Sequence, residues 1–378
     1  MKKAKWIISL FLISILLTSL LSGCAKNNKE LVLGVVSPLT GSGAASGVIQ
    51  LNGVKLAVEE INAAGGIETK DGKVKIKMVS EDDEGIPAKS VTVTQKLATQ
   101  DKMDVMIGAL NSSCTLADMQ VTAKLKIPQF TPSSTAASIT QQGNKYIFRN
   151  ATPDPTHVAS LFKYITQGLK AKNVAILYES TDFGMGGQKL IAEKAKELGV
   201  NVTANELYNS GEKDFSVQLT KIKNSNPDVI LLWGYYAEAA LIAKQMKQYG
   251  ITQPLMGTGY NSPKLIELGQ EAVNGIIFST PFTAANPDKN VQAFLEKYRK
   301  AYNQDPDQNA AQAYDAVYMI ADAVKKVGVD KEKIREYIAG MKNFPGVAGV
   351  TNFDDKGDVI KDLDLVRIEN GKHTLVRY

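Results

Sequence analysis

Two successive rounds of alternating strand and helix patterns constrain the fold of this chain more than any other feature of its sequence. The strand candidates of the first round are residues 31–37, 74–78, 104–109 and 127–131, and the helix candidates between them are 48–61, 86–100 and 115–125. Alternation of this kind predicts a parallel sheet that is covered by helices on both faces. We therefore predict a doubly wound α/β lobe.

The alternation then restarts, which predicts a second lobe of the same type. Its strand candidates are 173–178, 201–207, 228–233, 254–257 and 275–279, and its helix candidates are 184–198, 215–224, 237–249 and 262–269. The mature chain is too long for one ordinary hydrophobic core, so two lobes also agree with its length.

The C-terminal third departs from this rhythm. Helical patterns at 290–302, 307–327 and 331–339 follow one another before strand patterns appear at 363–368 and 374–377. Helices that follow a completed second lobe are most simply returned to the first lobe. The chain should then cross between the lobes more than once, which favours a hinge with the ligand in the cleft.

We expect the hinge segments at 150–155, 280–283 and 350–354, which are flanked by Pro and Gly. Lobe 1 would then comprise residues 31–152 and 283–353. Lobe 2 would comprise residues 153–282 and 354–378.

The N-terminus predicts export. Lysines at positions 2, 3 and 5 precede an uncharged apolar stretch at 6–21, which is shorter than the roughly 20 residues that a helix needs to span a bilayer. Residues 1–23 are therefore predicted to be a signal peptide. The sequence Leu21-Ser22-Gly23-Cys24 resembles the lipobox of bacterial lipoproteins, which implies a diacylglycerol on Cys24 and a polar tether at 24–30. We expect an extracytoplasmic protein that is anchored to the cell membrane by this lipid.

Charge and cysteine content exclude several classes of function. Removing the signal peptide takes three lysines from a net charge of +5, which leaves +2 and argues against nucleic acid as a partner. If Cys24 is lipidated, Cys114 has no partner for a disulfide. The two histidines, His157 and His373, are expected at solvated positions and are too few for a zinc site of the usual type. We expect neither a metal nor a cofactor.

Polar loops follow two neighbouring strand candidates of the first lobe. Leu110-Asn111-Ser112-Ser113-Cys114 follows the strand at 104–109, and Pro132-Ser133-Ser134-Thr135 follows the strand at 127–131. In doubly wound sheets, ligands lie beyond the carboxyl ends of the strands. Main-chain N–H groups and hydroxyls at a helix start favour an anion such as a carboxylate. The alternative that these residues are only N-caps stays open for each loop alone, but two such loops favour binding.

Beyond these loops, the chain resembles the leucine/isoleucine/valine-binding proteins over nearly all of its mature length. The matching stretches are Ile61-Asn62-Ala63-Ala64-Gly65-Gly66-Ile67, Ile107-Gly108, Thr131-Pro132, Gly211-Glu212-Lys213-Asp214-Phe215-Ser216, Tyr236-Ala237-Glu238-Ala239-Ala240 with Gln245, and Phe353-Asp354-Asp355-Lys356-Gly357-Asp358. This resemblance implies the type I periplasmic-binding fold and the solute-binding role in a branched-chain amino acid ABC importer. It also implies that the permease and its ATPase are separate partners.

The resemblance also implies a set of ligand-binding residues. In the family, positions matching Ser112, Ser133 and Thr135 hold the ligand carboxylate, and positions matching Phe183 and Tyr235 close over the ligand from the second lobe. Phe183 stands where the family often has tyrosine. The further residues that we expect at the ligand are Asn111, Ser46 and Thr258.

Two departures from the family pattern concern the first lobe. The family can carry a disulfide there, and the matching positions in this chain are Gly85 and Asn111. An aromatic residue often found in the first glycine-rich loop is replaced by small residues around Ser46.

A third departure concerns the ligand's ammonium group. The family places an acidic residue after the strand matching 254–257, where this chain reads Thr-Gly-Tyr-Asn-Ser at 258–262. A buried ammonium without an anionic partner is costly. Either another acid such as Asp182 reaches the ligand, or Tyr235 and Tyr260 supply cation–π attraction, or the ligand has no ammonium.

An enzyme is the main alternative from another class. The loop 41–47 approaches the dinucleotide motif G-x-G-x-x-G but has Ser46 at the third glycine, and export argues against a nicotinamide cofactor. There is no G-x-S-x-G elbow, and we identify no catalytic residues.

We therefore predict a monomeric solute-binding lipoprotein of an ABC importer that is not an enzyme. Its ligand would be a small carboxylate, most simply a branched-chain or other hydrophobic amino acid. The alternatives are a 2-oxo or aromatic acid on the same fold, or a ligand-sensing receptor component.

Overall fold

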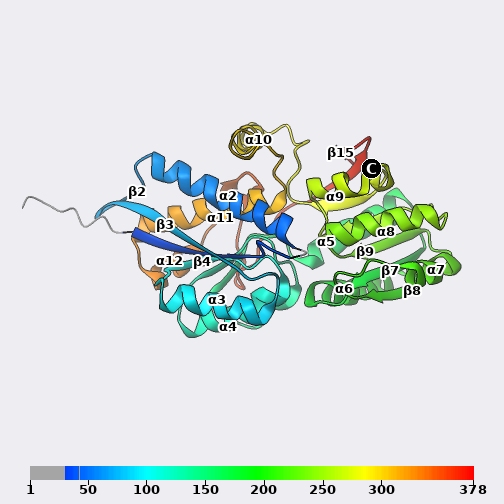
Figure 1. Cartoon of the computed structure of the whole chain (residues 1–378), viewed down its shortest axis with the longest axis horizontal. Helices are drawn as coiled ribbons and strands as arrows, with labels where there is room; N and C mark the ends of the chain where they lie inside the picture. The colour runs from blue at the N-terminus through cyan, green and yellow to red at the C-terminus, as the bar shows by residue number, and fades with distance from the viewer. Residues whose placement is uncertain (1–29, 42) are drawn as a thin grey trace, which may run out of the picture.

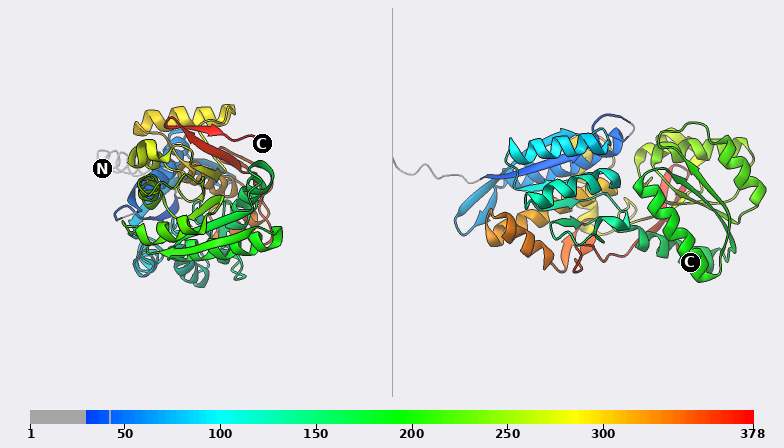
Figure 2. Two further views of the ribbon diagram at one scale, coloured as in Figure 1. Left: turned by 90° about the vertical axis from the view of Figure 1, so that its right-hand side faces the viewer. Right: turned by 90° about the horizontal axis from the view of Figure 1, so that it is seen from below.

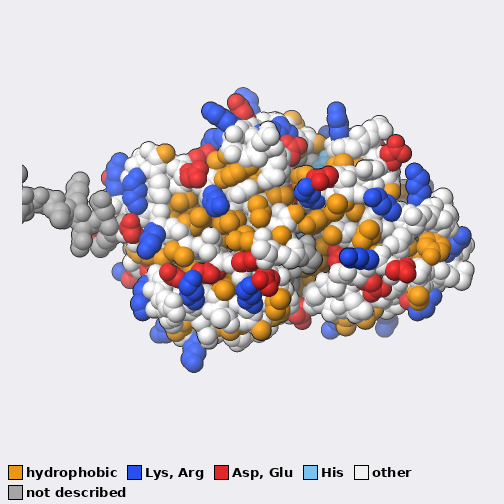
Figure 3. Space-filling model, viewed as in Figure 1, with side chains coloured by type: hydrophobic (Ala, Val, Ile, Leu, Met, Phe, Trp, Pro, Cys, Tyr) orange, Lys and Arg blue, Asp and Glu red, His pale blue; other side chains and the backbone are white. Residues whose placement is uncertain are grey.

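The computed structural model describes residues 30–41 and 43–378 as two α/β lobes that lie end to end (Figure 1). The predicted signal peptide, the lipidated Cys24 and nearly all of the tether lie outside the described residues. Within the described residues, no helix combines the length and the apolar character needed to cross a membrane. On the face seen in Figure 3, Lys and Arg side chains are interspersed with Asp and Glu and do not gather into a basic surface.

The first lobe contains a six-stranded sheet in the order β2-β3-β1-β4-β5-β6. Its strands are β1 (Glu30–Ser37), β2 (Ile67–Thr69), β3 (Gly72–Asp82), β4 (Val105–Ile107), β5 (Gln129–Thr131) and β6 (Ile147–Arg149). All neighbouring strands pair in parallel except β2, which forms an antiparallel hairpin with β3. The strands are rich in Val, Ile and Leu because helices cover both faces of the sheet.

The helices of the first lobe come from both ends of the chain. They are α2 (Ala44–Ala63), α3 (Pro87–Thr99), α4 (Ser112–Lys124), α10 (Lys289–Tyr302), α11 (Gln308–Val327) and α12 (Lys331–Ala339), with a short 3₁₀ turn η1 (Ala137–Ile139) and a hairpin of β12 (Phe344–Gly346) and β13 (Gly349–Thr351). Phe294, Ile320 and Ile334 from the three late helices share one core with the β1 residues Leu33 and Val35. The predicted return of these helices to the first lobe is confirmed.

The second lobe contains a seven-stranded sheet in the order β15-β14-β11-β10-β9-β7-β8. Its strands are β7 (Asn173–Glu179), β8 (Asn201–Tyr208), β9 (Val229–Trp233), β10 (Leu255–Thr258), β11 (Ile277–Thr280), β14 (Asp364–Glu369) and β15 (Lys372–Leu375). Its helical segments are α5 (Asp154–Lys163), the π turn η2 (Tyr164–Gly168), α6 (Asp182–Leu198), α7 (Ser216–Ser225), α8 (Tyr236–Gln248), α9 (Pro263–Gly269) and the 3₁₀ turn η3 (Gln270–Val273). The predicted fold class, two doubly wound lobes, is confirmed.

The described chain passes between the lobes three times: between β6 and α5, between β11 and α10, and between β13 and β14 (Figure 2). The third crossing lies later than the sequence suggested. Phe353 and Val359 pair in a β-bridge and belong to the first-lobe core, although residues from 354 onward were assigned to lobe 2. We therefore propose that lobe 1 extends to about residue 360.

Candidate functional site

A cavity lies between the lobes at the carboxyl ends of both sheets. Its empty volume is about 500 Å³, open solvent included. Its lining residues are Ser46, Leu110, Ser112, Ser133, Thr135, Phe183, Tyr235, Thr258, Gly259, Asn261, Ser262, Gln308 and Asn309. Seven of the eight residues that the sequence places at the ligand therefore line one cavity, and the eighth is Asn111.

The first-lobe wall is formed by the loops after β4 and β5. The Oγ of Ser112, the first residue of α4, accepts a hydrogen bond from the main-chain nitrogen of Ala136 at 3.3 Å. Ser133 donates to Oε1 of Gln50 at 2.6 Å. Ser134 donates to the main-chain oxygen of Leu110 at 3.0 Å and does not line the cavity. The two loops are thereby tied to each other and to α2.

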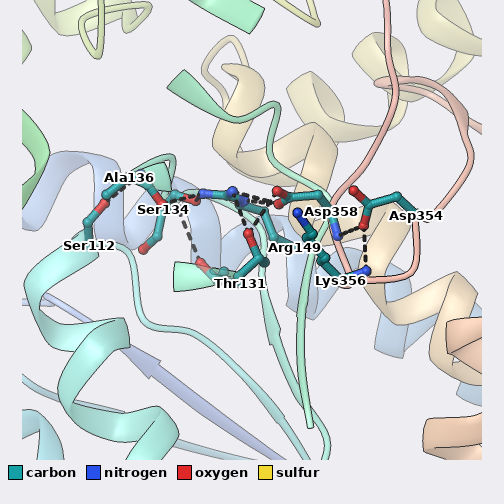
Figure 4. A network of polar contacts seen from close by, with 9 residues as sticks. Ser112, Thr131, Ser134, Ala136, Arg149, Asp354, Lys356 and Asp358 are labelled. Carbon is teal, nitrogen blue, oxygen red and sulfur yellow. Dashed lines mark hydrogen bonds and ion pairs between the residues drawn. The ribbon is translucent and has the colours of Figure 1, made fainter. Parts of the chain in front are cut away.

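A buried arginine fixes the loop after β5 from behind (Figure 4). Arg149 is fully buried, and its Nη1 donates to the main-chain oxygen of Ala136 at 2.7 Å. Its Nε and Nη2 lie 2.7 and 2.6 Å from Oδ1 of Asp358. The main-chain nitrogen of Asp358 in turn donates to Asp354 at 2.8 Å. Because the guanidinium is held on both sides, the loop that carries Ser133 and Thr135 is held in place before a ligand arrives.

Two aromatic rings form the second-lobe wall. Phe183 lies in the first turn of α6, and Tyr235 directly precedes α8, with ring centroids 5.3 Å apart. Gly259 closes this wall at a backbone φ of 91°, where a Cβ would lie 2.8 Å from the Phe183 ring. Only glycine fits this position without displacing the ring.

Asn111 bridges the two lobes and does not line the cavity. Its Nδ2 donates to the Tyr235 hydroxyl at 3.3 Å, and its side chain makes no capping bond to α4 although Asn111 occupies the N-cap position. A Cβ added to Gly85 would lie 3.2 Å from Oδ1 of Asn111, so the two positions that match the family disulfide are adjacent. The direct contact between the lobes shows that the cleft is closed in this structure.

No acidic side chain is among the described residues that line the cavity. Three residues were expected to contact the ligand ammonium. Asp182 is exposed at the start of α6, and Tyr260 is fully buried away from the cavity, so neither of these two lines the cavity. The third, Tyr235, lines it.

A buried acid that the sequence analysis missed lies behind Thr135. Asp154, the first residue of α5, is 0% exposed, and its main-chain nitrogen donates to the Thr135 oxygen at 2.9 Å. Neither of its carboxylate oxygens has a hydrogen-bond partner among the described residues. Burial raises the pKa of Asp154 to about 7, although the Thr135 hydroxyl and the charge of Arg149 act in the opposite direction. The only sequence feature that could have indicated this residue is its position directly after the proline of the predicted hinge segment 150–155.

His157 is buried, contrary to the expectation of a solvated position. Its Nδ1 lies 2.7 Å from Oγ of Ser279 and 3.3 Å from Oγ1 of Thr258, a cavity residue. Burial lowers the pKa of His157 to about 3, so the ring is neutral. His373 is also partly buried, with its ring edge-on to Phe278. In the described part of the chain, no group of three His, Cys, Asp or Glu side chains could hold a metal ion.

The remaining lining residues were not predicted. Asn261 and Ser262 lie between β10 and α9, and Gln308 and Asn309 begin α11. The polar residues 261 and 262 lie in the stretch 258–262, whose sequence was notable only for its lack of an acid. The helix α11 reaches the cavity only because the chain returns to the first lobe.

Comparisons with known proteins agree with this architecture. The periplasmic binding protein family matches residues 30–372. A leucine-, isoleucine-, valine-, threonine- and alanine-binding protein of Pseudomonas aeruginosa is 30% identical over 340 residues, which cover 89% of each chain. The crystal structure of LivJ from Streptococcus pneumoniae with isoleucine is 33% identical, with a TM-score of 0.84 over 92% of this chain and 99% of that one.

Two further structures extend the comparison. LivK, a leucine-binding protein of Thermotoga maritima, is 31% identical, with a TM-score of 0.86 over 92% of this chain and 98% of that one. A solute-binding protein of Rhodopseudomonas palustris in complex with 3,4-dihydroxybenzoic acid shares the fold, with a TM-score of 0.84 at 22% identity over 92% of this chain and 96% of that one. Because the match spans nearly all of the described residues, the chain belongs to the periplasmic binding protein family, among the leucine/isoleucine/valine-binding proteins.

Proposed function

We propose that this protein is the extracytoplasmic solute-binding lipoprotein of an ABC importer and that it captures an amino acid rather than catalysing a reaction. The observation that carries the proposal is a cavity between two closed lobes whose described lining is uncharged and rich in hydroxyl groups. The binding of isoleucine by LivJ and the names of the other relatives support an amino acid as the ligand.

The ligand carboxylate faces the start of α4 in this proposal. The hydroxyl hydrogen of Ser112 is free to donate because its oxygen is the acceptor for Ala136. The first main-chain N–H groups of α4 point in the same direction, and the helix dipole favours a negative charge there. Each hydrogen bond to the carboxylate contributes about 1.5–3 kcal/mol.

In place of the carboxylate role that the resemblance implies for Ser133 and Thr135, these two residues face the ligand ammonium in this proposal. Ser133 has already given its hydroxyl hydrogen to Gln50, so its oxygen is left as an acceptor. Asp154 lies directly behind Thr135 with both carboxylate oxygens unpaired in the described structure, and it supplies the negative charge that the lining itself lacks. A buried cation needs a nearby anion. Asp154 would therefore take the place of the acid that is missing from residues 258–262.

Ligand capture is coupled to closure of the lobes. Phe183 and Tyr235 cover the cavity from the second lobe, while the carboxylate and ammonium contacts lie on the first. A ligand that touches both walls binds the closed state more tightly than the open one and therefore shifts the equilibrium towards closure. The closed form would then be presented to the permease, with the lipid on Cys24 holding the protein at the membrane.

Thermal unfolding against a panel of ligands tests this function. Amino acids at 100 times their Kd should raise the free energy of unfolding by about 2.7 kcal/mol. The matched 2-oxo acids, which lack only the ammonium, and a set of aromatic acids should have much smaller effects. Stabilisation by 2-oxo or aromatic acids alone would show that the ligand is a carboxylate without an ammonium group.

A further inference from the structure

One wall of the cavity is built from amide and hydroxyl side chains. Asn261 and Ser262 come from the loop after β10, Gln308 and Asn309 from the start of α11, and Ser46 from the first turn of α2. These loops are separate from those after β4 and β5 that carry the proposed carboxylate and ammonium contacts. This second wall is therefore separate from the proposed carboxylate and ammonium contacts and is available to the ligand side chain.

Contacts outside the cavity fix the orientation of the Asn261 amide. Its Nδ2 donates to Oγ1 of Thr280 at 2.7 Å and to the main-chain oxygen of Phe282 at 3.1 Å. A main-chain oxygen can only accept, so the nitrogen of the amide must be on that side. Both of its hydrogens are used there, and what Asn261 has left to offer is the acceptor Oδ1.

Two neighbours offer donors. Oε1 of Gln308 accepts from Thr280 Oγ1 at 2.9 Å, which leaves its Nε2 without a partner in the described structure. The Oγ of Ser262 accepts from the main-chain nitrogen of Lys264 at 3.3 Å, which leaves its hydroxyl hydrogen free. The wall therefore presents donors and acceptors together, and contacts with Thr280 at the end of β11 hold Asn261 and Gln308 in place.

We propose that the ligand side chain is uncharged and forms hydrogen bonds, as an amide or a hydroxyl does, and that the site discriminates against branched aliphatic side chains. This inference rests on the proposed amino-acid function. An aliphatic group would remove water from Asn261, Ser262 and Gln308 without replacing its hydrogen bonds, which is costly for buried polar groups. Sites built to hydrogen-bond a ligand reject analogues that lack the matching group. A charged side chain would find no opposite charge in the described lining.

Titration calorimetry on the mature protein, stripped of bound ligand by unfolding and refolding, tests the inference. The probes are L-glutamine, L-asparagine and L-threonine against L-leucine, L-isoleucine and L-valine. At least one polar amino acid should bind at least about tenfold more tightly than every branched-chain one. Equal or tighter binding of a branched-chain amino acid would overturn the inference and leave the proposed function intact.

A variant pair connects the selectivity to this wall. Asn309→Leu places an aliphatic group in the cavity and should shift the ratio of polar to leucine affinity towards leucine by about tenfold. Gln95→Leu makes a similar exchange at an exposed position on α3 and should leave the ratio unchanged. An unchanged ratio in both Asn309→Leu and Gln308→Leu would show that the wall does not select the side chain.

Glutamine methyl ester separates the two proposals. It keeps the side chain but has no free carboxylate, so it should bind far more weakly than glutamine. If the ester binds as tightly as the acid, or if none of the six amino acids binds, the proposed function fails and the inference fails with it.

Discussion

Individual serine hydroxyls have different roles in the proposed site. The hydrogen bonds that each hydroxyl already makes within the protein determine whether it can donate to the ligand or accept from it. Ser112 keeps its hydrogen for the ligand, whereas Ser133 has given its hydrogen to Gln50. Residue type alone could not separate these roles, because a serine both donates and accepts. The resemblance to the family named both residues, and the tertiary contacts assign the direction of each bond.

Thr135→Ala should weaken ligand binding by about 10- to 100-fold, the loss expected for one hydrogen bond to a charged group. The main-chain oxygen of Thr135 still accepts from Asp154, so the free energy of unfolding without ligand should change little. Calorimetry and chemical denaturation measure the two effects, with exposed Thr92→Ala on α3 as the control. Equal losses of binding and stability would mark Thr135 as a structural residue.

Asp154 should make stability and binding depend on pH in opposite directions. Its pKa is about 7 in the folded chain and near 3.8 in the unfolded one, so the folded state binds more protons between these values. The unfolding free energy should therefore fall as pH rises from 4 to 7, by at most about 1.4 kcal/mol per pH unit from this group. Affinity for an amino acid should rise over pH 6–8 as the carboxylate ionises.

The neutral variant Asp154→Asn should make the pH dependence of stability shallower and remove the pH dependence of affinity, and exposed Asp71→Asn should leave both unchanged. Denaturation and calorimetry at several pH values measure the difference between variant and parent. This comparison is needed because burial also raises the pKa of Asp118 and Asp307 to about 7. A pH profile that the Asp154 exchange leaves unaltered would rule the residue out as the counter-charge.

At the scale of elements, the clearest apolar patterns were the ones that the sequence could show. The strand pattern at 31–37 and the helix patterns of α10, α11 and α12 correspond to observed elements within a few residues. The strands β2, β6, β12 and β13, of three residues each, were not predicted, whereas the equally short β4 and β5 lie within the predicted strands at 104–109 and 127–131. The helix α5 was marked only by its first turn, after Pro153.

Close packing of α2 on α11 gives a test at this scale. A Cβ on Gly53 would lie 2.2 Å from the main-chain oxygen of Ala310, so Gly53→Ala must push the helices apart and should cost about 1–3 kcal/mol. Gly186 lies within α6 with nothing within 4 Å of its Cβ position, so Gly186→Ala should stabilise by about 0.5–1 kcal/mol. Thermal unfolding distinguishes them, and a loss of stability in both would contradict the packing argument.

At the scale of the whole molecule, the contact between Asn111 and Tyr235 joins lobes that three chain segments connect. The Nδ2 of Asn111 donates to the Tyr235 hydroxyl across the cleft, so this amide favours the closed state. The ring of Tyr235 also packs on Phe183, which couples the bridge to the cavity wall.

Tyr235→Phe removes only the hydroxyl of this bridge and should shift the unliganded protein towards the open state. One hydrogen bond of about 0.5–1.5 kcal/mol corresponds to roughly a two- to tenfold change in the equilibrium and in affinity. Small-angle scattering should show a larger radius of gyration without ligand and the same radius with saturating ligand. Tyr249→Phe, at the exposed residue that follows α8, is the control. An unchanged unliganded radius in Tyr235→Phe would show that the bridge does not hold the lobes.

The sequence by itself determined the two doubly wound lobes and the return of the late helices, because these follow from local apolar periods. Polar loops at two strand ends indicated part of the cavity lining, and the resemblance to the family implied the residues of the second-lobe wall. Only the tertiary structure decided where the third crossing lies, that His157 is buried, and that Asp154 stands behind Thr135. It also decided that the amides of Asn261, Gln308 and Asn309 meet in one wall. These features depend on contacts between segments far apart in the chain, and burial and hydrogen-bond direction are set by such contacts rather than by the identity of neighbouring residues.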